Sequence, residues 1–92
     1  MAGKDYLREN PDGSVTITLA RGVTIDGASI KVLTMREPTV GDQIAAQAGK
    51  ADPARHEVAL IANLCSIAPN DVEALTMRDY RRVQAALMGF LD

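Results

Sequence analysis

The feature that most constrains this chain is a change in the spacing of its apolar residues at Glu37-Pro38. Before this point apolar side chains recur at every second position, the period of a half-buried strand, and after it they recur at helical spacing. A residue before proline favours extended geometry, and Thr39 followed by Asp42 matches a weaker form of the capping box that begins a helix. The stretch 33–42, which we call the junction segment, is therefore predicted to end a strand, turn the chain and open a helical region.

The part of the chain before the junction segment predicts a β-hairpin over about 14–36. Apolar residues alternate with polar ones over 15–25, and Gly22 interrupts the pattern in a way that is typical of a bulge or kink. Asp26-Gly27 favours a tight hairpin turn, because type I′ geometry needs positive φ at both central positions. A two-stranded ribbon is marginal in water, so we expect it to pack on the helices.

The part after the junction segment predicts helices. Asp52-Pro53 combines an N-cap residue with a proline at the first helical position, and the helix that follows has a broad apolar face typical of a central core helix. Thr76, with Asp79 three residues on, begins the last helix, which has the clearest amphipathic stripe. The helices are expected at about 39–48, 53–67, 70–74 and 76–91.

These elements predict an α+β fold in which an N-terminal β-hairpin packs on a small bundle of three to four α-helices. Residues 1–13 are polar and rich in turn formers, so we expect them to form a flexible lead-in. The remainder, 14–92, is expected to form a single α+β domain. A chain of 92 residues buries only about 60 to 65% of its unfolded surface, so the core must be small.

Charge and composition exclude several classes of protein. The formal net charge is -2, with 10 basic and 12 acidic residues mixed along the chain, which argues against a nucleic-acid binder. Arg78, Arg81 and Arg82 come closest to a basic patch, and we interpret them as a solvated helix face. No apolar run approaches the ~20 residues of a membrane span. With no visible signal peptide and a single cysteine, Cys65, the sequence predicts a soluble cytosolic protein without membrane contact.

The sequence offers no credible catalytic or metal-binding constellation. His56 is the only histidine and is expected on the surface of a helix. Cys65 lies on an apolar helix face, where we expect a buried side chain rather than a reactive thiolate. Phosphate-binding glycine motifs are missing, and Asp71 and Glu73 lie on a short turn with nothing to raise a pKa. We therefore predict a protein that is not an enzyme and that needs neither cofactor nor metal.

The remaining functional hypothesis is that the surface binds a partner protein. We take six residues as candidate contacts, two from the junction segment, two from the helix that it opens and two from the last helix: Arg36, Glu37, Val40, Ile44, Met88 and Phe90. Two structural alternatives stay open. The first pair can instead form an ion pair or backbone tether that fixes the turn, and the last pair, at helical spacing, can instead belong to the core.

The segments 33–37 and 75–79 nearly repeat each other, since each reads Leu-Thr-Met-Arg followed by an acid. The residues on either side of the two segments differ, so we interpret the similarity as a leucine joined to a Thr-x-x-acid helix boundary in both places.

The junction segment, Leu-Thr-Met-Arg-Glu-Pro-Thr-Val-Gly-Asp, resembles that of the tail assembly chaperone family of long-tailed phages, the group of Mu-like tail proteins labelled E, 41 or 14. The order of the other parts is also similar. A strand at 15–19 and a glycine-containing turn precede the segment. A leucine-rich helix at 60–65, a Pro-led acidic turn at 69–72 and the Leu-Thr-Met-Arg-Asp-Tyr start of the last helix follow it. The resemblance covers about residues 15–91.

The resemblance implies a non-enzymatic protein of the host bacterial cytoplasm. It would hold the tape measure protein, and tail tube protein as a second partner, soluble until the tube polymerises, and it would be absent from the mature virion. An apolar surface that pairs with itself would instead favour a small adaptor or antitoxin-like module. A third interpretation is a DNA-binding regulator that uses Arg78, Arg81 and Arg82 of the last helix.

Overall fold

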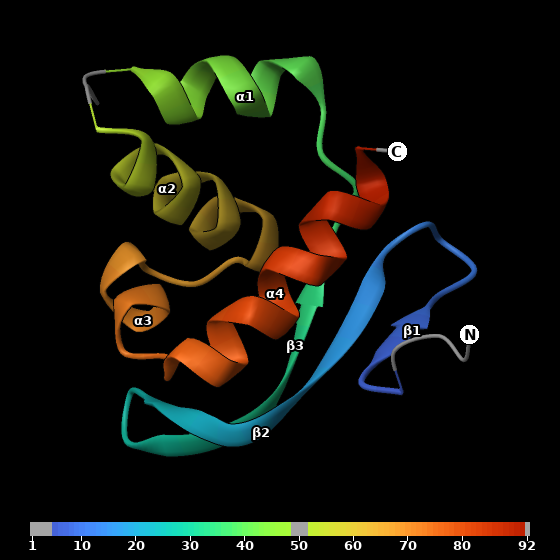
Figure 1. Cartoon of the computed structure of the whole chain (residues 1–92), viewed down its shortest axis with the longest axis vertical. Coiled ribbons are helices and arrows are strands. Elements are labelled where there is room, and N and C mark those ends of the chain that lie inside the picture. Colours follow the sequence, from blue (N-terminus) through green and yellow to red (C-terminus); the bar gives the residue numbers. More distant parts are fainter. Residues whose placement is uncertain (1–4, 49–51, 92) are drawn as a thin grey trace.

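The computed structural model describes residues 5–48 and 52–91. It contains a three-stranded antiparallel sheet followed by four helices, which confirms the α+β fold class. Figure 1 shows the helices gathered beside the long β2–β3 ribbon, with β1 at its outer edge. The elements are β1 (Leu7–Glu9), β2 (Val15–Ile25), β3 (Ala28–Met35), α1 (Val40–Gln47), α2 (Pro53–Cys65), α3 (Pro69–Glu73) and α4 (Met77–Phe90).

Strand β1 corrects the expectation that residues 1–13 form a flexible lead-in. Leu7–Glu9 pairs antiparallel with the start of β2, and the Thr18 N–H donates a hydrogen bond of 2.8 Å to the Tyr6 carbonyl. The Asn10 side chain closes the intervening turn by donating to the Ser14 hydroxyl at 3.0 Å. Polar turn formers therefore connect two paired strands here. Residues 1–4 lie outside the described part of the chain.

The hairpin itself follows the sequence prediction. The register of β2 on β3 shifts between Thr18 and Val23, and Gly22 adopts φ +86°, so the bulge expected near this glycine is confirmed. Asp26 and Gly27 have φ values of 52° and 81°, which is the pair of positive values that the tight turn requires. β2 is therefore strongly kinked before it turns into β3.

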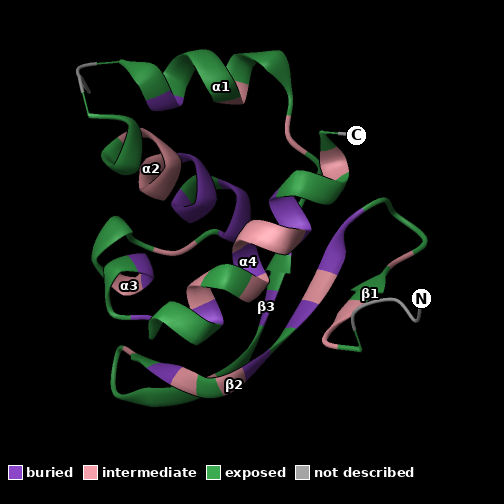
Figure 2. Cartoon of the chain, viewed as in Figure 1, coloured by how far each residue is buried: buried purple, intermediate pink, exposed green. Residues whose placement is uncertain are grey.

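Apolar side chains from one side of the sheet and from α2, α3 and α4 form the core, which Figure 2 shows as the purple positions that face one another. Ile17 and Met35 are fully buried on β2 and β3, while Ile61 and Val83 are fully buried on α2 and α4. Helix α1 stands apart, because it packs on α2 and buries only Ala46. It is thus the helix with the most solvent-exposed surface for its length.

The near-repeat 33–37 does not form a helix boundary, so that interpretation is wrong for the first copy. Thr34 lies inside β3, paired with Thr16, and the helix that follows begins five residues later at its own cap, Thr39. In the second copy Thr76 caps α4 as expected. The proline that follows the first copy explains the difference, since Glu37 before Pro38 cannot enter a helix easily.

Candidate functional site

The junction segment is fixed by a ring of hydrogen bonds around Asp42. The Thr39 N–H donates to Asp42 Oδ2 at 2.9 Å, and the Asp42 N–H donates to Thr39 Oγ1 at 3.2 Å, which completes a capping box on α1. Both guanidinium nitrogens of Arg36 donate to the same carboxylate, at 2.7 and 2.8 Å, and the Asn63 amide reaches it from α2 at 3.3 Å. Arg36, followed by the Thr39 backbone, holds the pKa of Asp42 well below its usual range.

Arg36 therefore has a structural partner, as the ion-pair alternative required. Its backbone also contributes, since the Arg36 N–H donates to the Leu64 carbonyl at 3.1 Å and ties the end of β3 to α2. Glu37, the second residue of this candidate pair, is exposed, and its carboxylate lies beside the turn at Gly13. Both side chains remain accessible, but Arg36 is already paired with Asp42 while the carboxylate of Glu37 takes part in no ion pair within the described part of the chain.

The second acidic anchor, Asp79 of α4, is fully buried. Its carboxylate accepts backbone N–H bonds from Ala20, Arg21 and Gly22 at 2.6, 3.0 and 3.0 Å. Burial raises the pKa of Asp79, but these three N–H groups together with the nearby Arg82 outweigh it, so the pKa lies below its usual value. The side chain predicted as part of a helix boundary thus holds the kink of β2 against α4.

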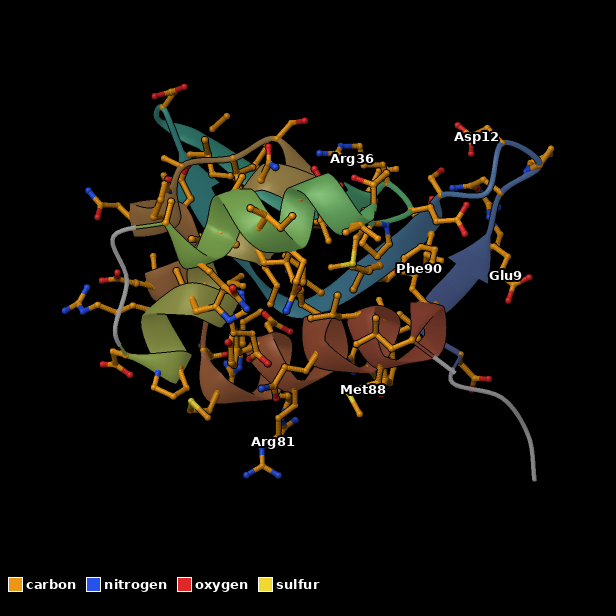
Figure 3. The ribbon with its side chains drawn as sticks, turned by 90° about the horizontal axis from the view of Figure 1, so that it is seen from above. Glu9, Asp12, Arg36, Arg81, Met88 and Phe90 are labelled. Carbon is orange, nitrogen blue, oxygen red and sulfur yellow. The ribbon has the colours of Figure 1, made fainter. Side chains whose placement is uncertain are left out.

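The arginines of α4 do not form one basic surface. The Arg82 guanidinium donates to the Thr18 carbonyl at 2.8 Å and lies 4.4 Å from the centre of the Tyr6 ring. Arg82 thus connects α4 to β2 and to the residue just before β1. Arg81 extends away from the protein, as Figure 3 shows, and Arg78 is exposed. This separation weakens the idea of a DNA-binding last helix, which needed the three side chains together.

The candidate apolar contacts lie in separate places. Val40 and Ile44, one turn apart on α1, are 79% and 65% exposed, and Met88 on α4 is 62% exposed. Phe90 is partly buried and packs against the core. Figure 3 shows Met88 extending from the outer side of α4, together with Arg81, while Phe90 extends from the opposite side towards β1. The structure therefore brings Val40 and Ile44 together but separates Met88 from Phe90.

Phe90 and Glu37 meet in a groove of about 730 Å³ between the β1–β2 turn and the end of α4, which we call the β1–α4 groove. Its volume falls in the range of about 300–1,000 Å³ that ligand sites occupy. The sequence could not show this groove, because its two walls come from opposite ends of the chain. It is lined by Leu7, Arg8, Glu9, Asn10, Gly13, Val15, Glu37, Ala85, Ala86, Gly89 and Phe90.

A second groove of about 540 Å³ runs along β3 and the end of α2, and includes Val32, Cys65 and Ile67. β3 is an edge strand. Because the Thr18 N–H is directed to β1, alternation along the ladder directs the backbone groups of Val32 and Thr34 to the open edge. We call this region the β3 edge. It too was missed by sequence reasoning, which treated β3 as one half of a hairpin.

The single cysteine and the single histidine, Cys65 and His56, both lie on α2. Cys65 is buried, as expected, and burial raises its pKa to about 12, so its thiol stays protonated. His56 is less exposed than expected, since its Nε2 is buried and finds no hydrogen-bond partner in the described part of the chain. Over residues 5–48 and 52–91 there is no group of three or more His, Cys, Asp or Glu side chains arranged to hold a metal ion. Within the same ranges, none of the helices has the length and apolar character needed to cross a membrane.

The described residues thus form a small α+β domain that exposes two grooves and several apolar side chains. Comparison with known families identifies the group to which the chain belongs. Residues 16–92 match the family described as phage tail assembly chaperone proteins, E, or 41 or 14. The match spans most of the chain, so the protein belongs to this family, and the resemblance found in the sequence is confirmed. No curated protein and no solved structure gave a significant match.

Proposed function

We propose that this chain binds the tape measure protein of a phage or prophage tail and keeps it soluble while the tail tube assembles. The family membership carries the proposal. The chaperone acts by binding rather than by catalysis, in the cytoplasm of the host bacterium, and leaves before the virion is complete. Tail tube protein is a second partner in this scheme, because the tube polymerises around the same extended protein.

The exposed apolar side chains support such a role. Val40, Ile44, Met77, Met88 and Leu91 are each more than half exposed, and Val40 and Ile44 lie one turn apart on α1. Methionine adapts its shape to different partners, and reversible binding of an unassembled protein needs that property.

Co-expression with the tape measure protein tests the proposal directly. The soluble fraction of the tape measure protein is compared with and without this chain, and the two are then passed together over a size-exclusion column. We expect a clear rise in soluble tape measure protein and co-elution of the pair. Unchanged solubility with separate elution would reduce the family relationship to one of fold.

A pair of variants locates the contact. Replacing Val40 and Ile44 together with serine removes the apolar pair of α1 without touching the core, because both side chains are exposed. We expect this double variant to lose most of the solubilising effect while its urea unfolding midpoint stays near that of the wild type. Val32→Ser makes a matched change on the β3 edge, where 47% of the side chain is exposed. A loss confined to Val32→Ser would move the contact from α1 to that edge.

The β3 edge supports one alternative function, that of an adaptor that pairs with itself. Open edge strands are templates for pairing with a second chain, and β3 is eight residues long. Light scattering on the isolated protein separates the two functions. A dimer that Val32→Ser disrupts, in a protein that leaves the tape measure protein insoluble, would favour the adaptor.

A further inference from the structure

We propose that the β1–α4 groove binds a short apolar segment of the tape measure protein that carries lysine or arginine next to its apolar side chains. This inference rests on the proposed function and adds to it the place and chemistry of one contact. Three independent features of the groove carry it: its apolar lining, a glycine that the fold does not need, and an excess of negative charge.

The lining offers apolar surface that residues 5–48 and 52–91 do not cover. Leu7 and Phe90 stand on opposite walls, and each is packed against the core on one side while remaining partly exposed on the groove side. Val15 and Ala86 form the base between them and are buried. An apolar side chain inserted between Leu7 and Phe90 would therefore be surrounded by apolar atoms, as are the anchors at the centres of protein interfaces.

Gly89 keeps the groove open. It lies inside α4, one residue before the last helical position, where glycine is less favourable than alanine because it loses more backbone freedom on folding. Internal packing does not explain it, since a Cβ added at Gly89 would meet nothing within 4 Å, and its φ is not in the left-handed region. A side chain at this position would instead occupy the groove that Gly89 lines. The glycine weakens the helix but leaves room for a partner.

The charge around the groove favours a basic partner. Glu9 and Glu37 line it and take part in no ion pair within the described part of the chain, and Arg8 is the only basic residue of the lining. The C-terminal end of α4 lies at the same place and carries partial negative charge. No basic residue in the last turn of α4 offsets that charge. A segment with lysine or arginine beside its apolar residue would match both the lining and this field.

Binding to overlapping synthetic peptides that cover the tape measure protein tests the inference. Fluorescence anisotropy with the full-length wild-type chain identifies the peptide that binds, and the groove variants are then measured against it. Gly89→Leu fills the groove, and we expect it to weaken binding by about tenfold or more. Glu9→Lys and Glu37→Lys should each weaken binding by about threefold to tenfold, and added salt should weaken wild-type binding.

Two matched controls separate the groove from general effects. Arg81→Leu places the same new side chain on the outer side of the same helix, and Glu73→Lys makes the same change of charge on α3, outside the groove. Both controls should bind the peptide as the wild type does. Gly89→Ala separates a role of the glycine in binding from a purely structural role. It should raise the urea unfolding midpoint while it weakens binding, because the methyl group favours the helix and narrows the groove.

The outcomes distinguish this inference from the proposed function. If the wild-type chain solubilises the tape measure protein and the groove variants bind its peptides unchanged, the inference is overturned and the proposed function stands. If no peptide binds and the whole protein is not solubilised, both fail. A self-associated wild type that Gly89→Leu converts to a monomer would overturn the inference in another way, because the occupant would then be a second copy of this chain.

Discussion

Helices α1 and α4 begin with the same residues, threonine followed three positions later by aspartate, yet the two aspartates have different roles. At α1, Asp42 accepts from the backbone of Thr39 and from Arg36, so most of its partners lie within six residues, with Asn63 of α2 as the exception. At α4, Thr76 accepts from the Asp79 N–H at 3.3 Å in the usual way, but the Asp79 carboxylate turns to the backbone of β2. One sequence pattern therefore serves as a helix cap in one place and as a tertiary anchor in the other.

The surroundings decide which role is taken. The bulge in β2 leaves the N–H groups of residues 20–22 without partners in the sheet, and these groups point at the start of α4. Buried N–H groups must be satisfied, and a carboxylate that accepts several of them is a strong solution. At α1 the Asp42 carboxylate instead accepts from the Thr39 N–H and from two polar side chains, those of Arg36 and Asn63. The comparison predicts unequal costs when each aspartate is removed.

The largest effect is expected from Asp79→Ala. The change removes the acceptor of three partly buried backbone N–H groups and should cost about 3 kcal/mol or more. Urea unfolding followed by circular dichroism measures the loss, and Asp42→Ala serves as the control. We expect Asp42→Ala to be clearly milder, because water can replace the carboxylate at an exposed cap. Similar losses at the two positions would show that Asp79 is no more than a cap.

The free energy of unfolding should also depend on pH through the carboxylate of Asp79. The pKa of Asp79 is lower in the folded chain than its ordinary value of 3.8. The ionised carboxylate therefore contributes stability that is fully present above that value and is lost as the pH falls through the lower, folded-state pKa. In Asp79→Asn this contribution is gone at every pH. Unfolding free energies measured from neutral to acidic pH should show the gap between the wild type and Asp79→Asn closing below about pH 4.

Gly22 is one of the three residues whose backbone N–H binds Asp79. Its replacement should have the next largest effect on the free energy of unfolding. A Cβ at this position would lie 2.8 Å from the Ile30 carbonyl oxygen, and φ is +86°. We expect Gly22→Ala to cost about 2 kcal/mol. Gly27→Ala is the matched control, since φ is +81° there but nothing lies within 4 Å. It should cost about 1 kcal/mol, which is the conformational part alone. Equal costs would mean that the bulge relaxes freely.

The structural features that could be predicted from the sequence are those that depend on residues close together in the chain. The tight turn at Asp26-Gly27, the bulge at Gly22 and the caps of the helices are encoded in a few adjacent residues, and the structure confirms them. Strand β1 was missed because its 3 residues are too few to show an alternating apolar pattern. The role of Asp79 was missed because its partners are 57 to 59 residues away in the sequence.

The candidate contacts follow the same rule. Val40 and Ile44 are four residues apart on one helix, so their common exposure could be anticipated from the spacing. Met88 and Phe90 are two residues apart, which places them about 200° apart around a helix, and they cannot share a contact face. The β1–α4 groove joins Leu7 to Phe90 and exists only once the sheet has brought the two ends of the chain together.

A smaller effect on stability is expected at the two threonines, which have the same role at the start of α1 and of α4. Thr39→Ala and Thr76→Ala each remove a hydroxyl that accepts the N–H three residues on. Each should cost about 1 kcal/mol, the usual value for loss of an N-cap side chain. Urea unfolding of the two variants side by side measures both. Nearly equal losses for the threonines, against unequal losses for the aspartates, would separate the shared cap from the anchor that only α4 has.

The smallest effect should come from Arg36→Ala. The guanidinium donates two hydrogen bonds to Asp42, but both partners are near solvent, and the capping box on α1 does not need it. Ion pairs of this kind contribute little and are weakened by salt. The urea midpoint of Arg36→Ala should therefore lie close to that of the wild type, and the small difference should shrink further in high salt. A larger loss of stability that persists in high salt would contradict this prediction. It would show that the Arg36–Asp42 pair of the junction segment, like Asp79, contributes substantially to the stability of the fold.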